Sequence, residues 1–184
     1  MKPFEILDEK TVHRTKIFNV NQVVLTNPYR NSKAEFVRID SPDWVNIIAV
    51  TTEGSILLIR QYRVGLDEIC LEIPGGMVDT GESPEAAARR ELLEETGYVP
   101  KRMESLGWVS PNPAFLNNRL HLFVAHECSL EAAPSFDTDE YVEVLVCTRS
   151  EVSRLLQGGD IHHALVVAAF GRFFSAFANE NSVP

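Results

Sequence analysis

Residues 75–98 read Gly-Gly-Met-Val-Asp-Thr-Gly-Glu-Ser-Pro-Glu-Ala-Ala-Ala-Arg-Arg-Glu-Leu-Leu-Glu-Glu-Thr-Gly-Tyr, and this segment carries the strongest helix signals in the chain. Ser83 is a good N-cap, Pro84 suits the first helical position, and Gly97 suits the C-cap. The residues between these signals all tolerate a helix. The segment therefore predicts a helix that ends at Gly97.

Three carboxylates of the predicted helix share one face. Glu91, Glu94 and Glu95 stand at positions i, i+3 and i+4, where like charges repel one another. Arg90 can pair with one of them, and hard divalent cations such as Mg²⁺ or Mn²⁺ prefer oxygen ligands of this kind. A solvated acidic face is the alternative interpretation. The double glycine at 75–76 favours the metal, because glycine allows close approach of the backbone to an ion.

The composition is that of an ordinary globular protein. The chain has 184 residues, of which 45% are apolar and 23% charged, so we expect one domain, or one domain with a small appendage. The 26 acidic residues outnumber the 17 basic ones and give a formal net charge of −9. This charge argues against a nucleic-acid partner held by a broad basic face. It does not exclude an acidic substrate, since a bound cation can reverse the sign of a pocket.

The cysteines and the apolar runs indicate the compartment. Cys70, Cys128 and Cys147 are widely spaced, odd in number and set among apolar neighbours, so we expect reduced core residues rather than disulfides or a thiolate metal site. The longest apolar run, residues 164–170, is too short to span a bilayer. We therefore expect a cytoplasmic protein with no membrane partner.

The rest of the chain predicts mixed strands and two further helices. Apolar stretches separated by a turn-rich segment predict a small antiparallel meander within residues 1–40. Further strands are expected at residues 44–51, 55–62, 69–73, 105–110, 119–127 and 141–147. One helix should start at Ser150, and another should run from about residue 162 to 178. The five histidines show no metal-binding spacing, and His162-His163 is interpreted as an exposed pair.

Residues 75–98 resemble the Nudix hydrolase signature G-x5-E-x7-R-E-U-x-E-E-x-G-U, in which U is a bulky apolar residue. The match is carried by Gly76, Glu82, Arg90, Glu91, Leu92, Glu94, Glu95 and Gly97. The resemblance implies an α+β fold, namely a Nudix-type α/β/α sandwich with a mixed sheet over residues 41–184, plus the small N-terminal antiparallel β-sheet. It also implies hydrolysis of a nucleoside diphosphate linked to another group, with Mg²⁺ or Mn²⁺ as cofactor and two or three ions per site.

The same resemblance implies roles for individual residues. The implied metal ligands are Gly75 through its carbonyl, Glu91, Glu94 and Glu95. Arg90 is expected to orient a helix glutamate, and Glu82 to support the loop and reach the metal through water. In the mechanism these residues imply, bound ions neutralise the diphosphate and activate a water molecule.

Residues outside the signature favour one branch of the family. Gln61-Tyr62-Arg63 and residues 71–76 resemble the Q-[YF]-R and L-E-[IL]-P-A-G segments of the ADP-ribose and nucleoside-diphosphate-sugar branch. Arg63 is the expected phosphate contact, with an ordinary surface arginine as the alternative. The implied substrate-binding residues are Arg63, Gln61, Glu72 and Pro113. The segment around Pro113 and the glycine at position 75 depart from the branch pattern, so the preferred sugar stays open.

The general base in this branch usually comes from an acidic loop before a late strand. Residues 137–140 form such a loop, and Glu140 is the predicted base, with Asp139 as second candidate. A solvated acidic turn is the alternative.

Together these features predict a homodimeric enzyme that splits ADP-ribose or a related nucleoside diphosphate sugar into a nucleoside monophosphate and a sugar phosphate. The alternatives are a nucleoside triphosphate pyrophosphohydrolase and an inactive, nucleotide-sensing Nudix module. The N-terminal meander is the expected dimerisation appendage.

Overall fold

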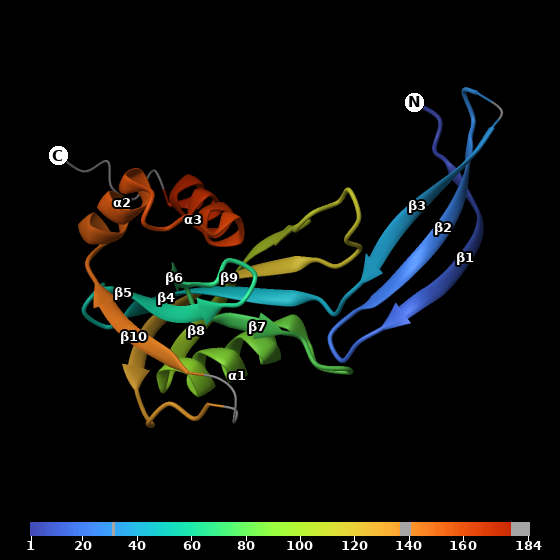
Figure 1. The fold of residues 1–184 in the computed structure, drawn as a ribbon. Helices are drawn as coiled ribbons and strands as arrows, with labels where there is room; N and C mark the ends of the chain where they lie inside the picture. Colours follow the sequence, from blue (N-terminus) through green and yellow to red (C-terminus); the bar gives the residue numbers. More distant parts are fainter. Residues whose placement is uncertain (31, 137–140, 178–184) are drawn as a thin grey trace. The chain divides into compact units, whose positions relative to one another are not determined.

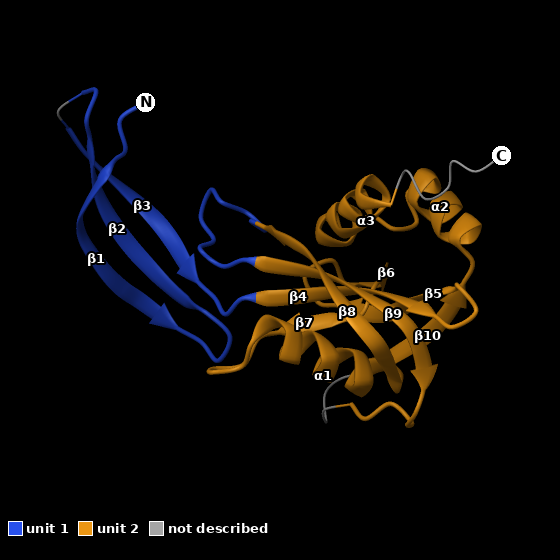
Figure 2. Ribbon diagram, turned by 180° about the vertical axis from the view of Figure 1, so that it is seen from behind, with its two compact units in different colours: residues 1–43, 110–119 blue, residues 44–109, 120–184 orange. Residues whose placement is uncertain are grey.

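Figure 1 shows the fold of the chain in a computed structural model that describes residues 1–30, 32–136 and 141–177. The chain divides into two compact units (Figure 2). Unit 1 consists of Met1–Asp43 and Ser110–Arg119, and unit 2 of Trp44–Val109 and Leu120–Pro184. The sequence suggested a boundary near residue 40, without the 110–119 segment. That segment joins unit 1 because the Ile39 N–H donates to the Phe115 carbonyl at 2.7 Å.

Unit 1 is built on a three-stranded antiparallel sheet, as the N-terminal apolar stretches predicted. Its strands, in sheet order, are β1 (Glu5–Arg14), β2 (Asn19–Asn27) and β3 (Ser32–Asp40). The first strand begins at Glu5, and all three strands lie within the predicted range of residues 1–40.

Unit 2 contains a mixed sheet, as expected. Its strands are β4 (Trp44–Thr51), β5 (Ile56–Arg63), β6 (Glu68–Glu72), β7 (Gly75–Met77), β8 (Tyr98–Val109), β9 (Leu120–Leu130) and β10 (Val142–Cys147). The order is β10-β5-β4-β9-β8, with β6 paired to β5 and β7 paired to β4. Strands β4 and β9 are parallel, while the other named pairs are antiparallel.

Helices cover both faces of this sheet (Figure 1). They are α1 (Pro84–Thr96), α2 (Arg149–Gly158) and α3 (Ala164–Ala176). The alternation of β4 assigns its side chains to the two layers. Val45 and Ile47 pack in the cluster that includes α1, whereas Ile48 and Val50 pack in the cluster that includes α2 and α3. The predicted α/β/α sandwich is therefore confirmed.

The helix caps follow the sequence signals closely. The Ser83 side chain accepts a hydrogen bond from the Ala86 N–H at 3.2 Å, and Gly97 ends α1 with a φ of 76°. Helix α2 begins one residue before the expected Ser150, because Thr148 and Glu151 form a reciprocal capping box.

One strand is longer than the sequence predicted. Strand β8 starts at Tyr98, directly after α1, rather than at residue 105. The sequence did not predict the first part of this strand because Pro100 and Gly107 are poor strand formers. Gly107 sits at a bulge with a φ of 84°. Within the described part of the chain, no helix is long and apolar enough to cross a membrane.

Candidate active site

The acidic face of α1 packs against the double glycine of β7. The Gly75 N–H donates to Glu95 Oε2 at 2.9 Å, and the Glu95 side chain is buried. A Cβ added at Gly76 would lie 2.3 Å from Glu91 Oε1. Only a residue without a side chain leaves room for the Glu91 carboxylate in this position. The glycines therefore fix where two of the predicted metal ligands lie.

Arg90 connects three glutamates and the loop that precedes α1. Its Nε and Nη2 donate to Glu82 at 3.1 and 2.9 Å, and its Nη1 donates to Glu91 at 2.8 Å and to Glu94 at 3.1 Å. Nη2 also donates to the Met77 carbonyl at 3.0 Å. The hydrogen bonds from Arg90 hold the pKa of Glu82 below its usual value, and the same contacts raise the pKa of Arg90. Arg90 thus holds the loop and the helix together.

The donor set of this cluster fits a hard divalent cation. Arg90 supplies one positive charge to three glutamates, and Glu95 adds a fourth carboxylate beside them, so negative charge is in excess. The Glu91 side chain is only 15% exposed, so water does little to screen it. Oxygen ligands grouped at this density, with backbone oxygens nearby, are what Mg²⁺ and Mn²⁺ bind.

An ion-pair network centred on the buried Glu72 joins the ends of β5 and β6 to the start of α3. Arg63 Nε and Nη2 donate to the two carboxylate oxygens of Glu72 at 2.7 and 2.8 Å. His163 Nδ1 lies 2.8 Å from Glu72 Oε2. Burial raises the pKa of Glu72, but hydrogen bonds from Arg63 and His163 outweigh burial and lower it to about 2. Glu72 is therefore an ionised acceptor with both oxygens hydrogen-bonded, and it fixes the Arg63 guanidinium.

This network corrects one expectation. His162 and His163 were expected to form an exposed pair, but His163 contacts the buried Glu72 and is only partly exposed. Glu72 and His163 are 91 positions apart in sequence, so no local pattern signals their contact.

Asn46 on β4 is a second residue that sequence reasoning missed. Its Nδ2 is buried, and the described residues provide no acceptor for it. Asn46 pairs with Gly75 in the β4–β7 ladder, so the amide lies beside the acidic cluster. The Asn46 side chain therefore fills the space beside Gly75, where an added Cβ would meet its Oδ1.

The remaining predicted site residues are distributed as follows. Gln61 is buried on β5, two positions before Arg63. Pro113 belongs to unit 1, in the segment 110–119. Glu140 and Asp139 lie outside the described residues, so the predicted base stays a prediction.

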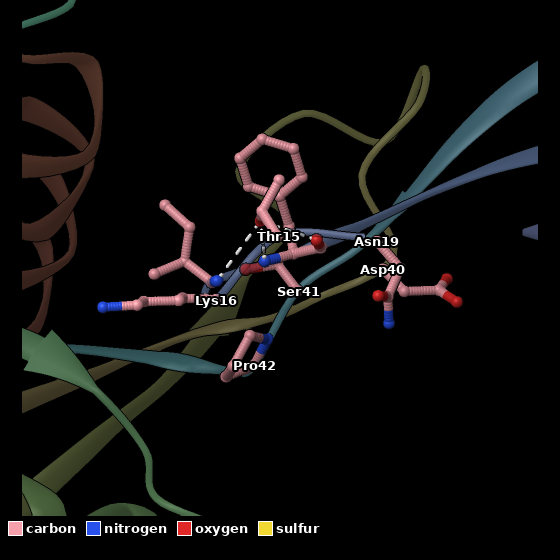
Figure 3. A pocket seen from close by; sticks show the side chains of 8 residues that line it. Thr15, Lys16, Asn19, Asp40, Ser41 and Pro42 are labelled. Carbon is pink, nitrogen blue, oxygen red and sulfur yellow. Dashed lines mark hydrogen bonds between the residues drawn. The ribbon is translucent and has the colours of Figure 1, made fainter. Parts of the chain in front are cut away.

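Unit 1 contains a separate open pocket of about 260 Å³ (Figure 3). It is lined by the turn at residues 15–19 and by residues 40–42. The turn is closed by Thr15, whose Oγ1 donates to the Phe18 carbonyl at 2.7 Å. None of the predicted site residues lines this pocket.

Comparison with known proteins places these features in a family context. The model of the NUDIX domain family matches residues 41–170. The chain is 37% identical over 166 residues to the ADP-ribose pyrophosphatase of Bacillus subtilis (strain 168), covering 86% of this chain and 88% of that protein. It is 36% identical over 173 residues to the methanol dehydrogenase activator of Bacillus methanolicus, covering 90% and 92%. A crystal structure of an ADP compounds hydrolase superposes with a TM-score of 0.87 at 26% identity, covering 100% of this chain and 98% of that one.

Proposed function

The chain belongs to the NUDIX domain family of hydrolases, and we propose that it hydrolyses the pyrophosphate bond of ADP-ribose or a related nucleoside diphosphate sugar. The products are a nucleoside monophosphate and a sugar phosphate. The observation that carries this proposal is the packing of Glu91 and Glu95 against Gly75 and Gly76, with Arg90 holding the neighbouring glutamates. The names of an ADP-ribose pyrophosphatase and an ADP compounds hydrolase among the similar proteins support the substrate class.

Nudix hydrolases generally use divalent metal ions, and the residues on α1 fit them. We assign the binding of two or three Mg²⁺ or Mn²⁺ ions to Glu91, Glu94, Glu95 and the Gly75 carbonyl. When bound, such ions neutralise the diphosphate and lower the pKa of a coordinated water molecule. Arg90 fixes the carboxylates of Glu91 and Glu94, so these ligands need little reorganisation when the substrate arrives.

The substrate side of the site rests on Arg63. Two of the five N–H donors of its guanidinium go to Glu72, and within residues 1–30, 32–136 and 141–177 the other three have no hydrogen-bond partner, so we assign them to phosphate oxygens. Arg63 is held by Glu72, which stands three residues before Gly75, and the Gly75 N–H donates to Glu95 of the acidic cluster. We assign phosphate binding to Arg63, and we assign Gln61 and Pro113 to the substrate, with Glu72 holding Arg63 in place.

We assign the role of general base to Glu140, with Asp139 as the alternative, because both precede β10 in an acidic stretch.

We also propose an oligomeric state and a compartment. The N-terminal sheet of unit 1 serves homodimer formation, a role supported by its many exposed apolar side chains. Free thiols at all three cysteines support a reducing compartment such as the cytoplasm.

A substrate panel with Mg²⁺ tests the proposal against its two alternatives. Release of AMP from ADP-ribose, with slower or no turnover of dGTP, supports the assigned activity. Release of inorganic pyrophosphate from dGTP, with ADP-ribose untouched, would instead identify a triphosphate pyrophosphohydrolase. Binding of nucleotides without turnover across ADP-ribose, GDP-mannose, UDP-glucose and dGTP would identify a sensing module.

A further inference from the structure

Three potential metal ligands converge at β6 and the loop before α3, and none of them belongs to α1 or β7. They are Glu68, Cys70 and His162, whose ligand atoms all lie within 4.8 Å of one another. Glu68 and Cys70 are two positions apart on β6 and therefore point to the same face of the strand. His162 reaches them from a segment 92 positions further along the chain than Cys70.

The distances in this cluster suit a single ion bound between the three side chains. His162 Nε2 lies 2.9 Å from Glu68 Oε1 and 3.9 Å from Cys70 Sγ. Typical zinc bond lengths in a tetrahedral site place nitrogen and oxygen ligands about 3.4 Å apart, and nitrogen and sulfur ligands about 3.6 Å apart. The first observed separation is shorter than the corresponding value and the second is longer, and the Glu68 oxygen and Cys70 Sγ lie within 4.8 Å of each other, so side-chain rotations are needed to bring the three ligands into place.

The backbone around His162 is held on both sides, which presents its imidazole to β6. On one side, the Ile161 side chain is buried, and the Asp160 and Ile161 N–H groups donate to the Leu155 carbonyl at 3.0 and 3.3 Å. On the other side, His163 contacts Glu72 at 2.8 Å. Cys70 is 1% exposed and lies in the β5–β6 ladder opposite Gln61. The site is therefore largely formed before any ion binds.

The ligand types distinguish this cluster from the acidic site on α1. A thiolate, an imidazole and a carboxylate form a mixed set that favours Zn²⁺, whereas the oxygen ligands of α1 favour Mg²⁺ or Mn²⁺. Three protein ligands leave the fourth tetrahedral position to water. We propose that Glu68, Cys70 and His162 form a Zn²⁺ site that ties β6 to the start of α3. The Cys70 Sγ–H proton is released to solvent as the zinc–sulfur bond forms.

This proposal differs from what the spacing of the cysteines predicted. The positions of Cys70, Cys128 and Cys147 argued against a thiolate metal site, because a usual zinc motif brings two cysteines close together in sequence. In this protein the fold, rather than the sequence spacing, brings one cysteine, one histidine and one glutamate together.

Cobalt binding to the full-length protein tests the site, because Co²⁺ replaces Zn²⁺ and reports its ligands by absorption. After treatment with a chelator and dialysis, the protein is titrated with Co²⁺ in excess Mg²⁺, which occupies the oxygen-ligand site. We expect one equivalent of Co²⁺ to produce a sulfur-to-cobalt charge-transfer band in the near ultraviolet and intense tetrahedral bands in the visible. Added Zn²⁺ should abolish both.

Matched variants identify the ligands. Cys70→Ser and His162→Ala should each remove the charge-transfer band or weaken Co²⁺ binding at least about tenfold. His162 is 44% exposed, so its variant keeps the fold, which circular dichroism verifies. Cys147→Ser and Glu91→Gln should retain the band. Absence of the band in the wild-type protein, its persistence in Cys70→Ser, or unchanged band and affinity in His162→Ala would overturn the proposal and leave an ordinary Glu68–His162 ion pair.

Thermal unfolding tests the site without relying on the Co²⁺ absorption bands. Zn²⁺ added in slight molar excess should raise the Tm of the wild-type protein and of Glu91→Gln, but not that of His162→Ala. Because this measurement involves no substrate, its failure is separate from failure of the proposed hydrolase activity. An equal rise of Tm in wild type and His162→Ala would contradict the assigned ligands.

Discussion

Arg63 and Glu72 form a bidentate ion pair, in which Arg63 Nε lies 2.7 Å from Glu72 Oε1 and Arg63 Nη2 lies 2.8 Å from Glu72 Oε2. The Glu72 side chain is 3% exposed, whereas that of Arg63 is 41% exposed. A carboxylate this deeply buried stays ionised only with a cation beside it. The pair therefore has a structural role for β5 and β6, besides fixing the guanidinium that we assign to phosphate binding.

Loss of the Glu72 charge should destabilise the protein in a pH-dependent manner. The pKa of Glu72 falls from 4.5 to about 2 on folding, so the folded protein binds this proton less tightly than the unfolded chain does. The resulting stabilisation is complete above about pH 5 and is lost as the pH falls towards 2. We expect Glu72→Gln to lower the free energy of unfolding by about 3 kcal/mol at pH 7. That deficit should shrink by about 2 kcal/mol at pH 3.

Urea unfolding of both proteins at the two pH values measures this difference. Glu143→Gln is the matched control, because the Arg60–Glu143 pair joins neighbouring strands but both side chains are about half exposed. Its effect should stay within about 0.5 kcal/mol at pH 7. A deficit for Glu72→Gln that is equal at pH 7 and pH 3 would show that the ion pair is not its source.

Replacement of Arg90 by lysine should disrupt the acidic face without removing its positive charge. A lysine is a point charge and cannot bridge three glutamates as the forked guanidinium does. We expect Arg90→Lys to lower kcat by about 10- to 100-fold. Arg89→Lys is the control, since Arg89 pairs with the exposed Glu85 on the same helix, and its kcat should change less than about twofold. Steady-state kinetics in which the two variants behave alike would contradict the role given to Arg90.

A methyl group at position 76 should impair metal binding more than folding. The new Cβ would displace the Glu91 carboxylate, which lies at the flexible end of its side chain. We expect Gly76→Ala to lower kcat by at least about tenfold and to raise the Mg²⁺ concentration for half-maximal rate, because a small misplacement of a reacting group is costly. A Cβ at Gly65 would meet open space, so Gly65→Ala should match the wild type in kcat and in the Mg²⁺ concentration for half-maximal rate. Wild-type Mg²⁺ dependence in Gly76→Ala would be inconsistent with Glu91 as a metal ligand.

The predicted base is tested by Glu140→Gln. Removal of a general base lowers the rate of the chemical step by about 10²- to 10⁴-fold and leaves binding largely intact. We therefore expect a lower kcat with little change in KM or in Mg²⁺ dependence. Asp139→Asn should have a much smaller effect. If Asp139→Asn alone abolished turnover, the two assignments would be exchanged.

The parts of the fold that local chemistry determines were predictable from the sequence. Ser83 and Gly97 cap α1 as their residue types indicated. The double glycine at residues 75–76 was expected to let the backbone approach an ion; in the structure both glycines have neighbours that leave no room for a Cβ, and the ion stays a prediction. Contacts between distant segments were not predictable. His163 meets Glu72 only because α3 packs on the same face of the sheet as Ile48 and Ile73, and nothing near either residue encodes that contact.

The boundary of unit 1 illustrates the same limit. Residues 111–118 carry no strand or helix signal, and the segment 110–119 joins unit 1 through backbone hydrogen bonds to Ile39. Backbone pairing of this kind depends on which segments meet in space and leaves no pattern of residue types. The cluster of Glu91, Glu94 and Glu95 was predictable because all three stand on one helix, whereas the Arg63–Glu72–His163 network spans three segments that are far apart in the sequence.

The most direct test of the proposed function is the hydrolysis of ADP-ribose by the wild-type protein and by Glu95→Gln, with and without Mg²⁺. Glu95 is buried and accepts from the Gly75 N–H, so glutamine fills the same space while removing the charge. We expect the wild type to release equal amounts of AMP and ribose 5-phosphate only with Mg²⁺ present, and Glu95→Gln to be at least about 100-fold slower. Equal rates for the two proteins, or AMP release that persists after complete removal of divalent ions, would contradict a metal site on α1.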